Sequence, residues 1–122
     1  MLLAMPPKGL TYGARSEWIA ERHLTWRGYR IIARNFRAAG AEIDLVAMHR
    51  GTLVFVEVKA RRSDTMGPPE ASVDDHKRAQ IRRAAEIFAV RHRARERPMR
   101  FDVIAIRGEG RTSTIKHWRN AF

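Results

Sequence analysis

Two apolar runs that contain charged residues constrain the fold of this chain more than any other feature. Glu42 to Arg61 reads Glu-Ile-Asp-Leu-Val-Ala-Met, then His-Arg-Gly-Thr, then Leu-Val-Phe-Val-Glu-Val-Lys-Ala-Arg. Apolar, β-branched runs on both sides of a short polar break with glycine are typical of a β-hairpin. Asp44, Glu57 and Lys59 lie inside these runs, although charged residues are rare in buried strands. Their presence therefore needs a reason.

The expected register brings the two acids together. Side chains alternate between the faces of a strand, so Glu57 and Lys59 share a face. A turn at Arg50–Gly51 pairs residue 49 with 52 and residue 47 with 54, and it sets Asp44 opposite Glu57 with Cβ atoms about 5 Å apart. Such a turn needs positive φ at both positions, which disfavours Arg50. The alternative is a loop one or two residues longer, which leaves the carboxylates diagonal but close.

Two carboxylates this close repel each other by about 3 kcal/mol at an effective dielectric constant of about 20. A chain keeps such a pair if a cation offsets the charge or if one acid is protonated. Lys59 is one possible cation, and Mg²⁺, which prefers oxygen ligands, is another. Asp44, Glu57 and Lys59 thus suit a site that cleaves phosphodiesters. The other interpretation is an edge hairpin whose charged face is simply solvated.

Composition indicates a nucleic-acid partner. The chain has 122 residues, which suits one domain, and its net charge of +11 points to a polyanion. The absence of cysteine excludes disulfides, thiolate metal sites and cysteine nucleophiles. No run is long and apolar enough for a membrane span, and the N-terminus does not resemble a signal peptide. We therefore expect a cytoplasmic protein that does not bind membranes.

The element pattern predicts a single α/β domain of residues 13–122 behind a loose arm of residues 1–12. The expected order is a helix, three strands, a helix and two strands, on one central mixed β-sheet flanked by helices. The expected bounds are 13–27 for the first helix, 29–35 for the first strand, a turn at 37–41, the hairpin, a loop after Lys59, a second helix opened near 72–75 by a capping box, and strands at 101–106 and 113–118.

The first helix carries an unexpected acid. Glu17 falls on the same face as Ala20 and Leu24. Glu17 is either a boundary residue paired with an arginine or a group that reaches toward the Asp44/Glu57 pair. Trp18 and Trp26 are predicted to pack internally, and the alternative is that they serve as platforms for base stacking.

Basic side chains are placed to hold a phosphate backbone. Arg61 and Arg62 open a polar loop beside the carboxylates. The second helix has an apolar face and, opposite it, a nearly single-signed basic face that favours an anionic partner. Its apolar positions are Ile81, Ala84, Ala85, Phe88 and Ala89, and its basic positions are Lys77, Arg78, Arg82 and Arg83.

Seven short motifs together carry a family resemblance. They are Gly13-x-x-x-Glu17-x-x-Ala20, Gly28-Tyr29, Asn35, Glu42-Ile-Asp44-Leu, Val54-Phe-Val-Glu57-Val-Lys59-x-Arg61, Arg100-Phe-Asp102-Val and Trp118-Arg-Asn-Ala-Phe122. The chain resembles the UPF0102 (YraN-like) family in this pattern, from Gly13 onward. One departure is Ala41, where the family usually has glycine; we expect only a slight change in the turn.

That family is similar to the restriction-endonuclease-like PD-(D/E)xK superfamily and, in motif order, to archaeal Holliday-junction resolvases. The resemblance implies a restriction endonuclease-like core of αβββαβ order. It implies that Asp44, Glu57 and the Val58 carbonyl bind Mg²⁺ or Mn²⁺, and that Lys59 orients or helps to deprotonate the attacking water. Glu17 matches the acid of the first helix, which contacts the metal through water.

The leading functional hypothesis is a metal-dependent endonuclease acting on DNA phosphodiester bonds, with branched or junction DNA in repair or recombination among its candidate substrates. A homodimer would suit cleavage of both strands. The alternative is a non-catalytic nucleic-acid-binding module of the same fold. A third hypothesis is a structural partner within a larger assembly. The sequence does not distinguish DNA from RNA.

Overall fold

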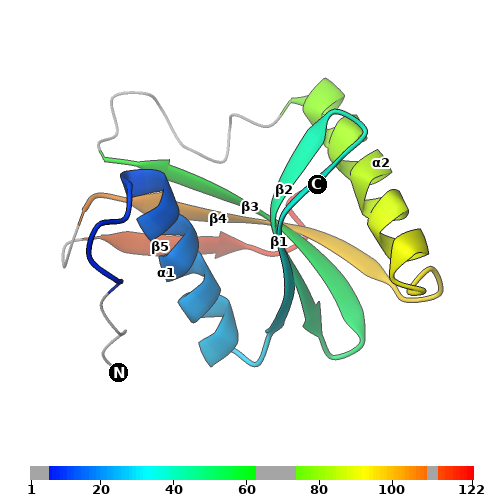
Figure 1. Cartoon of the computed structure of the whole chain (residues 1–122), viewed down its shortest axis with the longest axis horizontal. Coiled ribbons are helices and arrows are strands. Elements are labelled where there is room, and N and C mark those ends of the chain that lie inside the picture. Colours follow the sequence, from blue (N-terminus) through cyan, green and yellow to red (C-terminus); the bar gives the residue numbers. More distant parts are fainter. Residues whose placement is uncertain (1–5, 63–73, 110–112) are drawn as a thin grey trace.

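The computed structural model describes residues 6–62, 74–109 and 113–122, which form two helices and five strands (Figure 1). In chain order these are α1 (Tyr12–Trp26), β1 (Arg30–Ala38), β2 (Ala41–His49), β3 (Thr52–Arg61), α2 (Asp75–Arg91), β4 (Met99–Arg107) and β5 (Thr114–Trp118). The order of helices and strands is the predicted one.

All five strands belong to one mixed sheet with the spatial order β1-β2-β3-β4-β5. β3 and β4 run parallel, and the other three neighbouring pairs are antiparallel. Parallel neighbours need a crossover connection, and α2 lies within the connection from β3 to β4. The predicted α/β fold is therefore confirmed, and it is consistent with a restriction endonuclease-like core.

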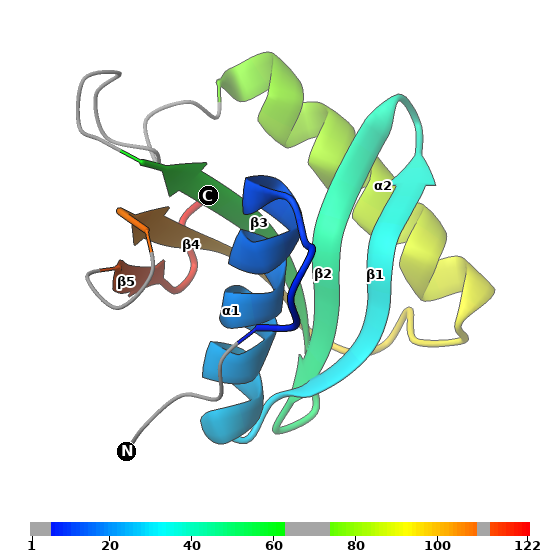
Figure 2. The ribbon, with the colours of Figure 1, turned by 60° about the vertical axis from the view of Figure 1, so that its left-hand side comes forward.

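One helix packs on each face of the sheet (Figure 2). On the α2 side, the Phe88 ring meets the rings of Phe55 and Phe36 edge-on, with centroids 5.8 and 5.1 Å apart. On the other side, α1 buries Ala20 and Leu24 against β2, β3 and β4. The apolar positions predicted for the second helix are all buried: Ile81, Ala84, Ala85, Phe88 and Ala89.

Two tight turns fix the hairpin registers. Ala39–Gly40 has φ angles of 53° and 77°, and Arg50–Gly51 has φ angles of 49° and 82°. Positive φ at both central positions is the requirement of a two-residue hairpin turn, and Arg50 meets it although it is not glycine. The shorter of the two predicted loops is therefore confirmed. The β2–β3 pairs are His49↔Thr52, Met48↔Leu53, Ala47↔Val54, Val46↔Phe55 and Leu45↔Val56.

Three strands extend further than predicted, and one of them, β4, spans Met99–Arg107 in place of 101–106. β1 reaches Ala38, because the turn to β2 needs only Ala39 and Gly40. β3 continues to Arg61, where the prediction began a loop after Lys59, because β4 pairs with β3 along its full length. Residues 63–73 of the predicted loop lie outside the described residues.

The helix ends follow the expected capping chemistry. The Thr11 hydroxyl accepts a hydrogen bond from the Ala14 amide at the start of α1, and Gly28, with φ of 85°, follows its end. α2 begins after Asp74, whose side chain accepts a hydrogen bond from the Lys77 amide. Ser72 of the predicted capping box lies outside the described residues. Of the described residues, neither helix has the length and apolar character to cross a membrane.

The prediction that both helix tryptophans pack internally is wrong for Trp26, which is 59 % exposed. Trp26 follows buried Leu24 by two positions, a rotation of about 200° around the helix, so it faces away from the sheet. Trp18 is half-buried, and the Arg22 guanidinium lies 5.5 Å from its ring centroid.

Candidate active site

Asp44 stands where the backbone pairing between β2 and β3 ends. The last pair of that ladder is Leu45↔Val56. One residue further along β2, Asp44 Oδ2 accepts a hydrogen bond from the Val58 backbone N–H at 2.8 Å. The neighbouring strand β1 is irregular at the same level, because Asn35 has a φ angle of 51°. The carboxylate thus takes the place of a backbone partner beyond the end of the ladder.

Val58 directs its carbonyl to the same side. In an antiparallel ladder, the N–H and C=O of one residue point to the same neighbouring strand. Because the Val58 N–H points to Asp44, the Val58 oxygen also faces β2 beyond the last backbone pair. The backbone oxygen expected to bind a metal therefore lies beside the Asp44 carboxylate.

Glu57 and Lys59 face α2. Val56 and Val58 pack into the core on the α1 side, so Glu57 and Lys59 share the opposite face, as predicted. Lys59 Nζ lies 2.9 Å from Glu57 Oε1, and Nζ of Lys77, from α2, lies 3.6 Å from the same oxygen. Glu57 is therefore a nearly buried carboxylate with two ammonium groups on one oxygen.

Glu17 reaches the cluster from α1. Together with Asp44 it lines a groove of about 240 Å³ between α1 and the β1–β2 hairpin. A hydrogen bond links the side chains of Glu17 and Asp44. The arginine pairing that was the alternative for Glu17 occurs four residues later, at Glu21, which accepts a hydrogen bond of 2.9 Å from Arg34 Nε. The structure therefore favours the reading in which Glu17 joins the acidic cluster.

The ionised forms of Asp44 and Glu17 are disfavoured. Burial, followed by the charge of Glu57, raises the pKa of Asp44 from 3.8 to about 7. Burial also raises the pKa of Glu17; its hydrogen bond with Asp44 opposes that rise, and the charges of Glu42 and Glu57 add to it. Near pH 7 the Asp44 carboxyl is thus close to half protonation. An acid in this state gains from any cation that favours its ionised form.

Lys59 stays charged. Burial lowers the pKa of Lys59, but the hydrogen bond and charge of Glu57 outweigh burial and raise that pKa above its ordinary value. The pKa of Lys77 is lowered, first by its hydrogen-bonding contact with Lys59 and then by burial. The two lysines therefore compete for one carboxylate.

The oxygen donors suit a hard divalent cation. Asp44, Glu57 and Glu17 supply carboxylates and Val58 supplies a carbonyl, the ligand types that Mg²⁺ accepts. Within residues 6–62, 74–109 and 113–122, no three His, Cys, Asp or Glu side chains are already arranged as a metal site. Two carboxylates and one backbone oxygen do not need such a trio. Burial and the Glu57 charge raise the pKa of Asp44, and a cation bound beside this carboxyl would offset both effects.

The predicted phosphate-binding arginines at the end of β3 divide between two faces. Strand alternation puts Arg61 on the face of Glu57 and Lys59 and puts Arg62 on the other. The Arg62 guanidinium lies 4.6 Å from the Tyr12 ring centroid, and its Nε lies 3.4 Å from a Glu109 oxygen. Arg61 is thus the one of the two that shares a face with Glu57 and Lys59.

The arginines near the start of α2 lie over the C-terminal residue. The guanidinium groups of Arg78 and Arg82 lie 5.6 and 5.9 Å from the Phe122 ring centroid. Arg82 is exposed and Arg78 is half-buried. Together they extend the positive charge of Lys77 along α2.

Lys77 is the site residue whose direction the sequence analysis missed. It was assigned to the outer basic face of the second helix, but its ammonium points to Glu57. Lys77 precedes Ile81 by four residues and Phe88 by eleven, which is the spacing of the buried stripe. That spacing is the sequence feature that could have indicated the inward direction of Lys77.

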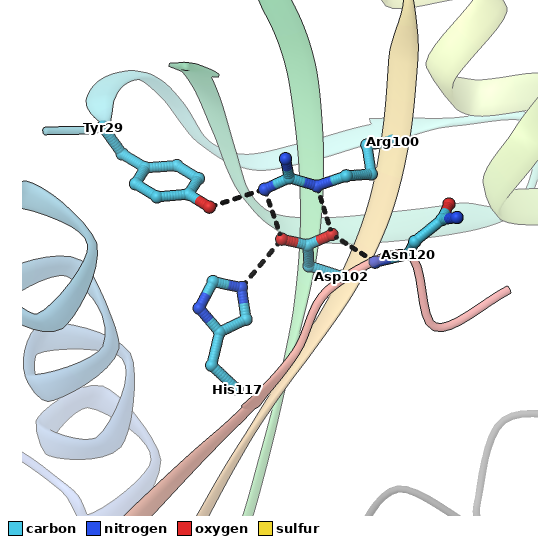
Figure 3. Close-up of polar contacts among 5 residues, drawn as sticks. All are labelled: Tyr29, Arg100, Asp102, His117 and Asn120. Atoms are coloured by element: carbon cyan, nitrogen blue, oxygen red, sulfur yellow. Dashed lines mark hydrogen bonds and ion pairs between the residues drawn. The ribbon is translucent and has the colours of Figure 1, made fainter. Parts of the chain in front are cut away.

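The sequence analysis also missed the role of Asp102, another buried carboxylate. Asp102 of β4 is fully buried, and Figure 3 shows it within a polar network. It accepts hydrogen bonds from Arg100 Nε and Nη2, both at 2.9 Å, from His117 Nε2 at 2.7 Å, and from the Asn120 amide at 2.9 Å. Arg100 also donates to the Tyr29 hydroxyl at 2.6 Å. The sequence did signal this carboxylate, because Asp102 is an acid inside an apolar run.

These hydrogen bonds determine the direction of the pKa shift of the Asp102 carboxyl. Burial by itself would raise its pKa, but the hydrogen bonds from His117, Arg100 and the Asn120 amide outweigh burial and lower the pKa to about 2. Asp102 is therefore ionised at neutral pH and ties the C-terminal segment to β4.

Comparison with known sequences identifies the relatives of this chain. The profile of the family described as "Uncharacterised protein family UPF0102" matches residues 16–106. A UPF0102 protein of Pelobacter propionicus is 45 % identical over 119 residues, covering 95 % of this chain and 85 % of the relative. One from Geobacter metallireducens is 43 % identical over 110 residues, covering 90 % of each chain. One from Caldanaerobacter subterraneus is 36 % identical over 115 residues, covering 92 % and 94 %.

Proposed function

The chain belongs to the UPF0102 family, and from this premise we propose that it is a metal-dependent endonuclease that hydrolyses DNA phosphodiester bonds. The observation that carries the proposal is the state of Asp44. Its carboxyl stands beyond the end of the β2–β3 ladder, beside the Val58 backbone and close enough to Glu57 for that charge to raise its pKa. Carboxyl groups perturbed by both burial and a neighbouring acid cluster at functional sites.

Four groups of this chain would hold the ion. Asp44, Glu57 and the Val58 carbonyl would bind it directly, and Glu17, whose side chain lies beside Asp44, would contact it through water. When bound, Mg²⁺ or Mn²⁺ supplies positive charge that acidifies a water and offsets the charge that builds up on the phosphate.

Lys59 has a more restricted role than the sequence suggested. Its ammonium lies against Glu57, whose hydrogen bond and charge raise the Lys59 pKa and so favour the protonated form over a general base. A charged ammonium 2.9 Å from Glu57 Oε1 instead orients the water and stabilises negative charge at the phosphate. Of the two roles expected for Lys59, the positioning role is the one that the geometry supports.

The nucleic-acid backbone would run along the start of α2. Arg61, Lys77, Arg78 and Arg82 bring positive charge to this side of the sheet, and the whole chain carries a net charge of +11. Contacts of this kind hold phosphates with little reading of base sequence. The same surface would serve a non-catalytic binding module, so turnover is the property that must be tested.

The test is a cleavage panel of single-stranded, duplex, flap and four-way-junction DNA with Mg²⁺ or Mn²⁺. Wild-type protein should cleave at least one of these substrates only when the metal is present. The double variant Asp44→Asn/Glu57→Gln should lose cleavage and keep salt-dependent DNA binding. A matched control, Asp75→Asn/Glu86→Gln, removes two exposed acids from α2 and should cleave like the wild type.

Two results would overturn the proposal. Cleavage by Asp44→Asn/Glu57→Gln at the wild-type rate would show that the acids are not the site. Salt-sensitive binding of every substrate without any metal-stimulated cleavage would favour the binding module.

A further inference from the structure

The contact between Lys77 and Glu57 has no evident role in the proposed reaction. Lys59 already neutralises Glu57, with Nζ 2.9 Å from Oε1. Lys77 adds a second ammonium 3.6 Å from the same oxygen, and the two lysines also contact each other. Two ammonium groups on one carboxylate oxygen are more than an ion pair needs, so the second cation calls for a separate explanation.

The two lysines differ in how firmly they are held. Lys59 extends from a central strand, and only 14 % of its side chain is exposed. Lys77 belongs to the first turn of α2, next to the N-cap Asp74, and 41 % of its side chain is exposed. A lysine stem with four methylene groups lets a half-exposed ammonium change partners without moving the backbone. Lys77 is therefore the cation that can leave.

We propose that Lys77 occupies Glu57 in place of a divalent metal, and that metal binding displaces its ammonium onto a phosphate of the bound nucleic acid. Metal and nucleic acid would then bind cooperatively. This inference rests on the proposed function, because it takes Glu57 as a metal ligand. It adds a coupling device that the carboxylates and Lys59 do not provide.

Electrostatics explains both why the metal displaces Lys77 from Glu57 and why the released ammonium binds a phosphate. A divalent ion on Glu57 repels an ammonium a few Å away, so the metal and Lys77 disfavour each other on that oxygen. Arg78 and Arg82 continue the positive charge of α2 beside Lys77, where a phosphate backbone would lie. The released ammonium thus has a favourable partner only when nucleic acid is present. Coupling of this kind is reciprocal, so each ligand should raise the affinity for the other.

The first measurement is Mg²⁺ affinity without nucleic acid, by isothermal titration calorimetry. Lys77→Met removes the competing charge and should bind Mg²⁺ about tenfold more tightly than the wild type, since one unit charge about 5 Å from a divalent ion has that effect even in water. Lys77→Arg keeps the charge and should resemble the wild type. Arg83→Met removes one exposed charge from the same helix and should change the affinity little.

The second measurement is the affinity for a phosphorothioate DNA duplex, which resists hydrolysis, with and without Mg²⁺. Mg²⁺ should tighten binding several-fold more for the wild type and Arg83→Met than for Lys77→Met. Unchanged or weaker Mg²⁺ binding by Lys77→Met, with the wild type binding Mg²⁺ through Asp44 and Glu57, would overturn this inference alone. If Asp44→Asn/Glu57→Gln binds Mg²⁺ as the wild type does, or the wild type binds none, the proposed metal site fails with it.

Discussion

Two aspartates on strands of one sheet, the fully buried Asp102 and the half-buried Asp44, have opposite chemistry. Asp102 accepts four hydrogen bonds, three of them from Arg100 and His117, and its pKa falls to about 2. Asp44 accepts one backbone hydrogen bond from Val58 and has acids as neighbours, and its pKa rises to about 7. Residue type and strand position are alike in the two, so the neighbours decide the difference.

The contrast separates a structural acid from a candidate functional one. Asp102 lies on the α1 side with all its charge matched, and it holds the C-terminal segment in place. At Asp44, burial and the Glu57 charge disfavour the ionised carboxyl, which weakens the fold as the pH rises. Groups whose ionised form is disfavoured in this way cluster at functional sites. Substitution of each aspartate by asparagine should therefore have opposite effects on stability.

The largest effect is expected at Asp102. Asp102→Asn leaves the buried Arg100 guanidinium without its counter-charge, so the free energy of unfolding at pH 7 should fall by about 3–5 kcal/mol. Because the pKa of Asp102 is lowered, its contribution is present above pH 3.8 and is lost as the pH falls through about 2. Urea denaturation measures the loss. Exposed Asp75→Asn is the control, and a loss for Asp102→Asn no larger than for this control would refute the structural role.

A smaller effect of opposite sign is expected at Asp44. Its raised pKa means that its contribution to stability is full below pH 3.8 and is lost as the pH rises through about 7. Asp44→Asn should therefore match the wild type at pH 4 and exceed its free energy of unfolding by about 2–4 kcal/mol at pH 8. Asparagine retains an oxygen that can accept the Val58 N–H.

The measurement for Asp44 is urea denaturation of the metal-free protein at both pH values. The same variant should be inactive in the cleavage panel, so stability and activity should move in opposite directions. A variant less stable than the wild type at pH 8 would mean that Asp44 is held by favourable contacts, like Asp102.

Most of what the sequence predicted about the candidate site came from the β2–β3 hairpin. Alternation along β3 placed Glu57 and Lys59 on one face, and the turn at Arg50–Gly51 set the pairing that leads to Asp44. Both are local properties of the chain. The apolar faces of the helices and the order of helices and strands along the chain are local as well. The acid of the first helix was recognisable as anomalous, although only the folded chain shows that Glu17 bonds to Asp44.

The rest depended on contacts between distant segments. Lys77 meets Glu57 only because the β3–α2–β4 crossover lays the start of α2 over β3. Apart from Arg100 and Asp102, which are two positions apart, the Asp102 network joins residues 15 to 71 positions apart in the chain. Trp26 was misassigned because a large aromatic side chain says nothing of which way the last turn of a helix faces.

The most direct test of the account is a ¹³C NMR titration of the carboxyl carbons of Asp44 and Asp102, with and without Mg²⁺. Without Mg²⁺, the Asp44 carboxyl should titrate at about pH 7 and Asp102 should stay ionised down to about pH 2. Saturating Mg²⁺ should lower the Asp44 midpoint to about pH 5 or below and leave Asp102 unchanged, because a bound cation favours the ionised ligand. An Asp44 midpoint at about pH 4 that Mg²⁺ does not move would contradict the account.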